Sequence, residues 1–101
     1  MMNSSLFILV LSLVSVSAFA KGDIARGEVI YKGCIECHGE DAHGIKEKNG
    51  PRLAGQFDWY LLSQLKAMKS GARKNLEMLP HIKELSEQDF QDVAAYISKL
   101  K

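Results

Sequence analysis

The segment Cys34-Ile35-Glu36-Cys37-His38 constrains this chain more than any other, because it has the spacing C-x-x-C-H. Two cysteines at this spacing can each form a thioether to one vinyl group of a porphyrin, and the histidine after them then lies beneath the iron. A fold that contains this segment must leave room for a large, flat, apolar group. We therefore expect one covalent haem on Cys34 and Cys37, with the neutral imidazole of His38 as an iron ligand.

Two other uses of paired cysteines fit the sequence less well. A structural zinc site needs four ligands, usually from a second cysteine or histidine pair, and this chain has only 2 cysteines. A thioredoxin-like dithiol belongs in a βαβ setting, and no segment here has a convincing strand pattern. The sequence therefore favours haem attachment.

Residues 1–20 have the pattern of a secretory signal peptide. They contain no charged side chain, run apolar from Leu6 to Phe19 with only serines as breaks, and end in the A-x-A cleavage site Ala18-Phe19-Ala20. An uncleaved membrane anchor is the alternative, because about 20 apolar residues can just span a bilayer. Cleavage predicts export, to the periplasm in a Gram-negative source, with no membrane insertion of the mature chain.

The remainder, residues 21–101, is expected to form one small domain. The chain carries 13 basic and 12 acidic residues, with a formal net charge of +1, which gives no reason to expect nucleic-acid binding. A domain this short usually needs a further source of stability in addition to its hydrophobic core, such as a disulfide or a bound metal. A covalent haem would supply that stability.

Hydrophobic periodicity and helix-end signals predict an all-α domain. Asp23 can cap the start of the first helix, Gly71 the end of the middle one, and Ser86 to Asp89 resemble a capping box for the last. Pro80 interrupts an irregular stretch. We expect helices at about residues 23–33, 57–70 and 86–100, and loops at 39–55 and 72–85.

The second axial position on the iron has four candidates, Met68, Met78, His43 and His81. Met68 lies on the apolar face of the predicted middle helix, where packing explains it. Met78 lies in the irregular stretch, from which a thioether can reach the distal side of a haem, and His81 follows closely enough to compete. His43 would need a sharp loop because it follows His38 so soon. Position alone leaves the choice open.

Several short segments, taken in order, resemble the class I c-type cytochromes over the whole of residues 21–101. The similarity is closest to the small single-haem bacterial cytochromes of the c553 type and to one half of a dihaem cytochrome c4. The matching segments are Gly22-Asp23, Gly27, Cys34 to Gly39, Gly50-Pro51, Leu53 to Gln56, Tyr60-Leu61, Gln64-Leu65, Gly71, Arg73, Leu76 to Met78, Leu85-Ser86 and Ala94 to Tyr96. The resemblance implies a class I cytochrome c fold, with three main helices and loops around one haem c.

The resemblance also implies roles for individual residues. Met78 aligns with the axial methionine of the family. The carbonyl of Pro51 would accept the Nδ1 hydrogen of His38 and so orient the ring. Gly27 would let the first helix cross closely over the last one near Tyr96.

Together these features predict an electron carrier and not an enzyme. It would pass single electrons between redox proteins in transient contacts, through one haem c held by His38 and Met78. Arg73 and Trp59 could meet a haem propionate, although surface or core packing explains both equally well. The alternatives are a haem sensor or peroxidase-type enzyme with an open distal site, and a membrane-anchored subunit of a respiratory complex.

Overall fold

The computed structural model describes residues 21–101, so the predicted signal peptide lies outside the described residues. The elements in this part are α1 (Ile24–Tyr31), α2 (Ile35–His38), the 3₁₀ turn η1 (Lys46–Lys48), α3 (Asp58–Ser70), α4 (Leu79–Ile82) and α5 (Glu87–Ser98). Between residues 21 and 101 the β pairing is limited to an isolated bridge between Ile45 and Gly50. The all-α prediction is confirmed. No helix within this range is long and apolar enough to cross a membrane.

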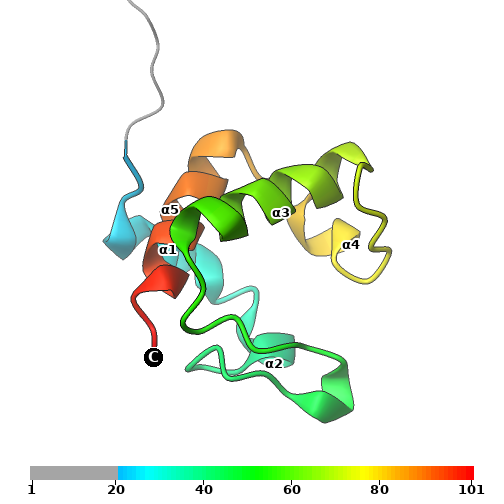
Figure 1. Cartoon of the computed structure of the whole chain (residues 1–101), viewed down its shortest axis with the longest axis horizontal. Helices are drawn as coiled ribbons and strands as arrows, with labels where there is room; N and C mark the ends of the chain where they lie inside the picture. Colours follow the sequence, from blue (N-terminus) through cyan, green and yellow to red (C-terminus); the bar gives the residue numbers. More distant parts are fainter. Residues whose placement is uncertain (1–20) are drawn as a thin grey trace, which may run out of the picture.

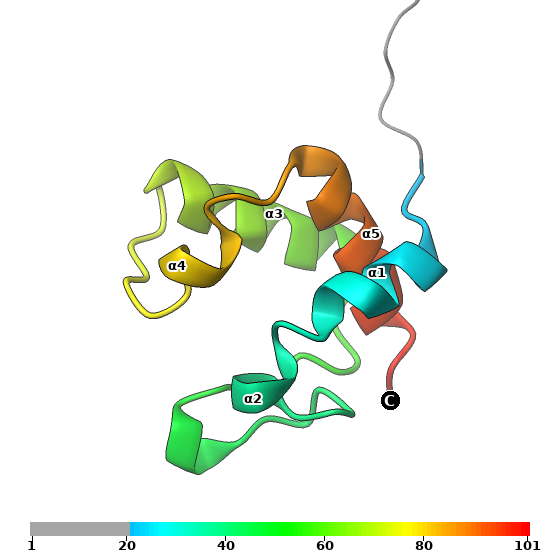
Figure 2. The same ribbon diagram turned by 180° about the vertical axis from the view of Figure 1, so that it is seen from behind.

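Three helices form the scaffold of the domain. α1 crosses α5, α3 packs against α5, and α4 contacts the other end of α3. Figures 1 and 2 show α2, its following loop and α4 on the same side of α3. The scaffold therefore presents the C-x-x-C-H segment and the Met78 segment to a common space.

Glycine at position 27 allows the close crossing of α1 and α5. A Cβ atom on Gly27 would lie 2.0 Å from the carbonyl oxygen of Asp92 and 2.9 Å from the Cβ atom of Tyr96. A Cβ atom on Gly22 would lie 2.3 Å from the carbonyl oxygen of Gln91. The expected close approach near Tyr96 is confirmed, and its cause is backbone-to-backbone contact at two glycines.

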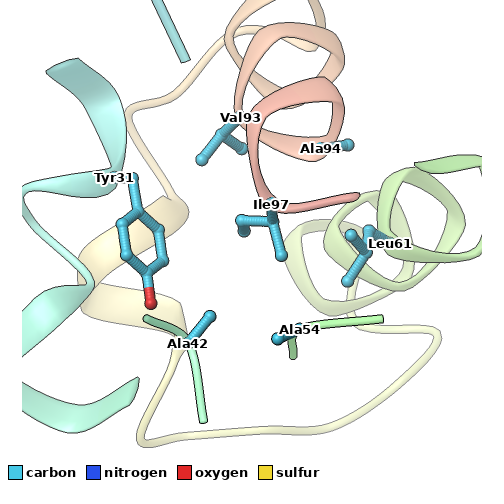
Figure 3. Packing of buried hydrophobic residues seen from close by; sticks show 7 residues of the cluster. All are labelled: Tyr31, Ala42, Ala54, Leu61, Val93, Ala94 and Ile97. Atoms are coloured by element: carbon cyan, nitrogen blue, oxygen red, sulfur yellow. The ribbon is translucent and has the colours of Figure 1, made fainter. Parts of the chain in front are cut away.

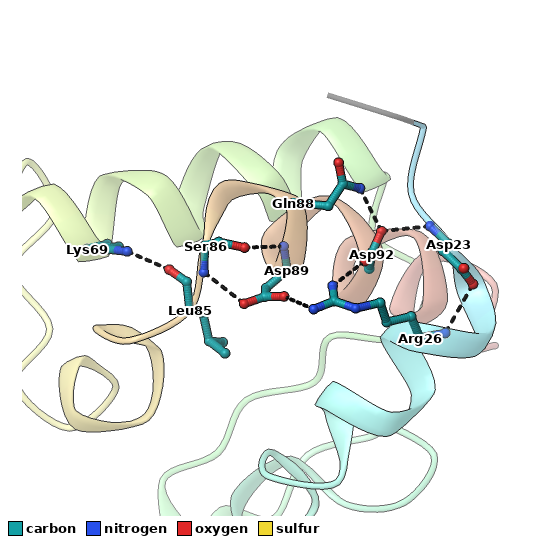
Figure 4. Close-up of polar contacts among 8 residues, drawn as sticks. All are labelled: Asp23, Arg26, Lys69, Leu85, Ser86, Gln88, Asp89 and Asp92. Carbon is teal, nitrogen blue, oxygen red and sulfur yellow. Dashed lines mark hydrogen bonds and ion pairs between the residues drawn. The ribbon is translucent and has the colours of Figure 1, made fainter. Parts of the chain in front are cut away.

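A buried carboxylate joins the same two helices (Figure 4). Asp92 is 1% exposed and accepts hydrogen bonds from the backbone N–H of Asp23 at 2.8 Å and the amide of Gln88 at 2.9 Å. Arg26 contacts Asp92 and Asp89, each at 2.5 Å. Burial alone would raise the pKa of Asp92, but the bonds from Asp23, Arg26 and Gln88 outweigh it and lower that pKa. The crossing is thus held by charge-assisted hydrogen bonds as well as by packing.

The apolar interior has two parts. The larger cluster joins α1, α3 and α5 to the loop after α2 (Figure 3), and consists of Tyr31, Ala42, Ala54, Leu61, Val93, Ala94 and Ile97. The smaller cluster joins α3, α4 and α5, and consists of Met68, Ile82 and Phe90. The second cluster fixes α4 to the scaffold, since Ile82 is its buried residue.

The predicted helix ends are close to those observed, with one segment wrongly assigned. Gly71 ends α3 in a left-handed conformation with φ 88°, and the Ser86–Asp89 capping box is present. The stretch expected to be irregular contains the short helix α4. Pro80 occupies its second position, where the missing N–H would have had no helical partner.

Replacing Gly27 by alanine should destabilise the domain, because the added Cβ atom would overlap the carbonyl of Asp92. We expect a loss of about 1–3 kcal/mol in the free energy of unfolding, measured by denaturant titration. Gly33→Ala is the matched control, since a Cβ atom there would have 3.6 Å to its nearest neighbour. Equal stability of the two variants would contradict the close crossing.

The stability of the domain should fall in acid. The pKa of Asp89 is lowered, mainly by the backbone N–H of Ser86, and that of Asp92 is lowered by its donors. Groups with a depressed folded-state pKa stabilise above the unfolded pKa, about 3.9, and lose that contribution as the pH falls through the folded value. The free energy of unfolding should therefore decrease below about pH 4.

Asp92→Asn should reduce this acid dependence and lower stability at neutral pH by about 1.5–3 kcal/mol, since a bond to a buried charge is lost. Denaturant titrations at several pH values test this expectation. The exposed residue Asp41 offers the control, and Asp41→Asn should keep the acid dependence.

Candidate functional site

A cavity of about 320 Å³ lies between α2, α3 and the segment around α4. Cys34, Cys37 and His38 line it from α2, and Met78 and His81 line it from the segment around α4. Its apolar lining also includes Leu53, Leu61, Leu65, Met68 and Ile97. The fold thus gathers the predicted attachment cysteines and the predicted axial residues around one largely apolar space.

The C-x-x-C-H segment forms a single helical turn that α1 supports. Cys34 is the N-cap of α2, and its carbonyl accepts the backbone N–H of His38 at 3.0 Å. The buried hydroxyl of Tyr31 donates to the carbonyl of Gly39 at 2.6 Å, at the end of that turn. Burial raises the pKa of Tyr31 to about 12, so the hydroxyl remains a donor. Tyr31 was not predicted from the sequence, although it lies one turn after Gly27 on the face that meets α5.

His38 is 5% exposed, and its Nδ1 atom lies 2.8 Å from the carbonyl oxygen of Pro51. The contact expected between these two residues is therefore present. A carbonyl oxygen can only accept, so Nδ1 of the neutral ring carries the hydrogen. The lone pair of Nε2 is then free to bind a metal.

Gly50 explains how Pro51 reaches His38. A Cβ atom on Gly50 would lie 1.6 Å from the carbonyl oxygen of Cys37, so the two backbones touch directly. Ile45 and Gly50 exchange backbone hydrogen bonds of 2.8 and 3.1 Å, which close the loop that contains η1. Any side chain at position 50 would push this loop, and Pro51 with it, away from α2.

The chemistry of the cysteines does not favour a redox-active dithiol. Burial raises the pKa of Cys34 to about 11, and the neighbouring Cys37 adds to the shift. Reactive thiols have a lowered pKa instead. Within residues 21–101 there is also no group of three or more histidine, cysteine or acidic side chains placed to hold a metal ion. Haem attachment is the use of the two cysteines that fits this environment.

A turn built on Asn75 presents Met78 to the cavity. The side-chain oxygen of Asn75 accepts hydrogen bonds from the backbone N–H groups of Glu77 at 3.2 Å and Met78 at 3.1 Å. The backbone carbonyl of Asn75 accepts a hydrogen bond from the backbone N–H of Leu79 at 3.1 Å. Asn75 was not predicted from the sequence, although asparagine is a common residue for such a turn. The segment before α4 is therefore more regular than expected.

The other axial candidates lie in different surroundings. Met68 lines the cavity but is 8% exposed within the smaller apolar cluster, as its predicted packing role requires. His81 lines the cavity and is exposed. His43 does not line it, and its Nε2 atom lies 2.7 Å from the carbonyl oxygen of Lys101. The geometry removes His43 from the candidates.

Arg73 and Trp59, the two residues considered for contacts with a haem propionate, differ in their position relative to the cavity. Arg73 lines the cavity, and its guanidinium donates to the side-chain oxygen of Gln64 at 2.7 Å. Trp59 does not line the cavity, is 65% exposed, and stacks on Phe57 with 5.8 Å between ring centroids. Arg73 is therefore the better placed of the two.

These observations fit a covalent haem c. The two thiols border the same apolar space as the His38 ring, whose hydrogen bond leaves Nε2 available, and the glycine contact holds that arrangement rigidly. The fold and site define a c-type, haem-binding helical domain.

Comparison with known proteins identifies the family. The chain belongs to the cytochrome c family, whose model matches residues 24–101. The family carries covalently attached haem c, which confirms the predicted cofactor, and the class I cytochrome c fold is confirmed as well.

Individual relatives agree with this assignment. Cytochrome c4 of Pseudomonas aeruginosa is 42% identical over 101 residues, covering 99% of this chain and 50% of that protein. Cytochrome c-554(548) of Halomonas halodenitrificans is 41% identical over 80 residues, covering 76% of this chain and 95% of that protein. The crystal structure of reduced recombinant cytochrome c4 from Pseudomonas stutzeri has a TM-score of 0.73 at 40% identity, covering 79% of this chain and 46% of that one. The chain thus spans about half the length of these cytochromes c4.

Gly50→Ala should reduce the yield of covalently attached haem, because the methyl group would separate the Pro51 loop from α2. Mass spectrometry of the purified chain measures the haem-bearing fraction. Gly33→Ala is again the control, since it also borders the cavity but has free space for a Cβ atom. A fully loaded Gly50→Ala protein would show that the backbone contact is dispensable.

Proposed function

We propose that this protein is an electron carrier that passes single electrons between redox proteins through one covalent haem c. The observation that carries the proposal is the cavity, which brings His38 and Met78 together with the two attachment cysteines. When bound, haem supplies the one-electron chemistry, while the protein orients it and tunes its potential.

Each site residue has a separate part in this proposal. Cys34 and Cys37 would form the thioethers, and His38 and Met78 would hold the iron. Pro51 holds the His38 ring in one orientation through the 2.8 Å contact at Nδ1 and strengthens Nε2 as a ligand. The sulfur of Met78 is a soft ligand that favours ferrous iron and raises the reduction potential.

This ligand set suits a carrier better than an enzyme. If His38 and Met78 both hold the iron, no protein ligand would need to bind or leave during electron transfer, and no position would be left for a substrate. The apolar lining of the cavity excludes water around the haem, which limits rearrangement of solvent during electron transfer. The relative from Pseudomonas stutzeri was solved in a reduced state, which supports a redox role for this family.

The cellular setting belongs to the same proposal. Residues 1–20 would direct export and be removed after Ala20, which would place the carrier in the periplasm. Its partners would be redox proteins that dock transiently over a small area, below about 1,200 Å², because a carrier must dissociate quickly.

Substitution of the proposed distal ligand tests the function. Met78→Ala should lower the reduction potential by an amount on the order of 100 mV, within the roughly 0.8 V range that axial ligands control. Spectroelectrochemical titration measures this shift. Met68→Ala should instead lower stability by about 2–5 kcal/mol, because it removes a buried side chain, and should change the potential less.

The wild-type spectrum provides the decisive comparison with a sensor or enzyme. A carrier should be low-spin in both oxidation states and bind carbon monoxide poorly. High-spin ferrous iron that binds carbon monoxide readily would falsify the carrier proposal.

A further inference from the structure

We propose that His81 is a reserve axial ligand, which binds the haem iron when the sulfur of Met78 is lost. The inference rests on the proposed function, in which Met78 is the normal distal ligand. With His81 in place of Met78, the same site would have a lower reduction potential.

The helical turn of α4 gives Met78 and His81 access to the same space. Met78 is the N-cap of α4 and already has helical dihedral angles, φ −79° and ψ −32°. The backbone N–H of His81 donates to the carbonyl of Met78 at 2.9 Å, so the two residues are one turn apart. Residues at this spacing lie on one side of a helical turn, and both line the cavity.

The two side chains differ in how firmly they are held. Met78 is partly buried and packs against the cluster of Met68, Ile82 and Phe90. His81 is exposed. The packed thioether is thus placed to bind first, while the imidazole remains hydrated at the edge of the cavity.

His81 is also the histidine that remains available for this purpose. The chain has 3 histidines. His38 is buried with its Nδ1 atom against Pro51, and His43 lies against the carbonyl of Lys101, away from the cavity. Met68 borders the cavity, but it belongs to α3 and could not move without shifting that helix.

An exchange of ligands requires little rearrangement of the fold. α4 packs on α3, and its one buried residue is Ile82. Residues 71–77 before it are exposed apart from Asn75, which is partly buried. A movement of this single turn about the Ile82 anchor would bring His81 forward and leave the α1–α5 crossing untouched.

Oxidation of methionine offers a chemical route to this state. Hydrogen peroxide transfers one oxygen atom to the sulfur of Met78, which gives methionine sulfoxide and water. The sulfoxide is polar and no longer suits the apolar cluster formed with Met68 and Phe90. Ligation by His81 would then lower the reduction potential while the iron stays closed to small molecules.

The first experiment compares Met78→Ala with the double variant Met78→Ala/His81→Ala, both loaded with haem. Met78→Ala should remain low-spin in both oxidation states, and the double variant should become high-spin. The double variant should bind carbon monoxide with an apparent affinity about tenfold higher or more, because a protein ligand no longer occupies most of the iron. Electron paramagnetic resonance and carbon monoxide titration measure these changes.

A second experiment leaves Met78 in place, in case its replacement prevents folding. Haem-loaded wild type, His81→Ala and the control His43→Ala are treated with hydrogen peroxide, and peptide mass spectrometry locates the added oxygen on Met78. Treated wild type and His43→Ala should stay low-spin with a lowered potential. Treated His81→Ala should become high-spin and bind carbon monoxide.

The outcomes separate this inference from the function on which it rests. A high-spin Met78→Ala protein, or a double variant that stays low-spin, overturns the role of His81 and leaves the carrier intact. A wild type that is high-spin and binds carbon monoxide readily before treatment overturns the proposed function itself.

Discussion

The direct contact between the backbone of Gly50 and that of Cys37 is the constraint on which the rest of the site depends. A Cβ atom at position 50 would lie 1.6 Å from the Cys37 carbonyl oxygen, so no other residue permits this approach. The contact places the carbonyl of Pro51 at 2.8 Å from Nδ1 of His38. One glycine thereby decides both the orientation of the imidazole and which of its nitrogen atoms faces a metal.

The helices supply a rigid frame for that contact. α1 and α5 approach closely at Gly27, and the buried Asp92 joins α5 to the start of α1 through Asp23 and Arg26. From this frame the hydroxyl of Tyr31 reaches the end of the C-x-x-C-H turn. The crossing therefore helps to hold the turn that contains the attachment cysteines.

The distal side of the cavity is built differently. It depends on a single helical turn, α4, anchored by Ile82 and preceded by a turn on Asn75. Such a short element can present one side chain or another with little change elsewhere. This contrast between a rigid proximal side and an adaptable distal side is the physical basis for assigning a reserve role to His81.

Much of this protein could be predicted from local sequence signals. The C-x-x-C-H spacing indicated the cofactor, the Ser86–Asp89 capping box and Gly71 marked helix ends, and the ordered family segments pointed to His38, Pro51 and Met78. These signals act within a few residues, where chemistry and dihedral preferences are decided by neighbours in the chain. The same local reasoning assigned α4 to an irregular stretch, because Pro80 there is compatible with either a loop or the start of a helix.

Only the tertiary structure decided the contacts between distant segments. Position alone left four axial candidates open. The fold placed His43 away from the cavity and packed Met68 into the smaller apolar cluster. It brought both Met78 and His81 to the cavity. The burial of Asp92 and the bond from Tyr31 to Gly39 were not predicted, because they too join distant segments. The chain by itself determined which cofactor it binds and where its three longer helices, α1, α3 and α5, lie. Packing decided which side chains surround that cofactor, because residues far apart in the sequence come close together only when the helices pack against one another.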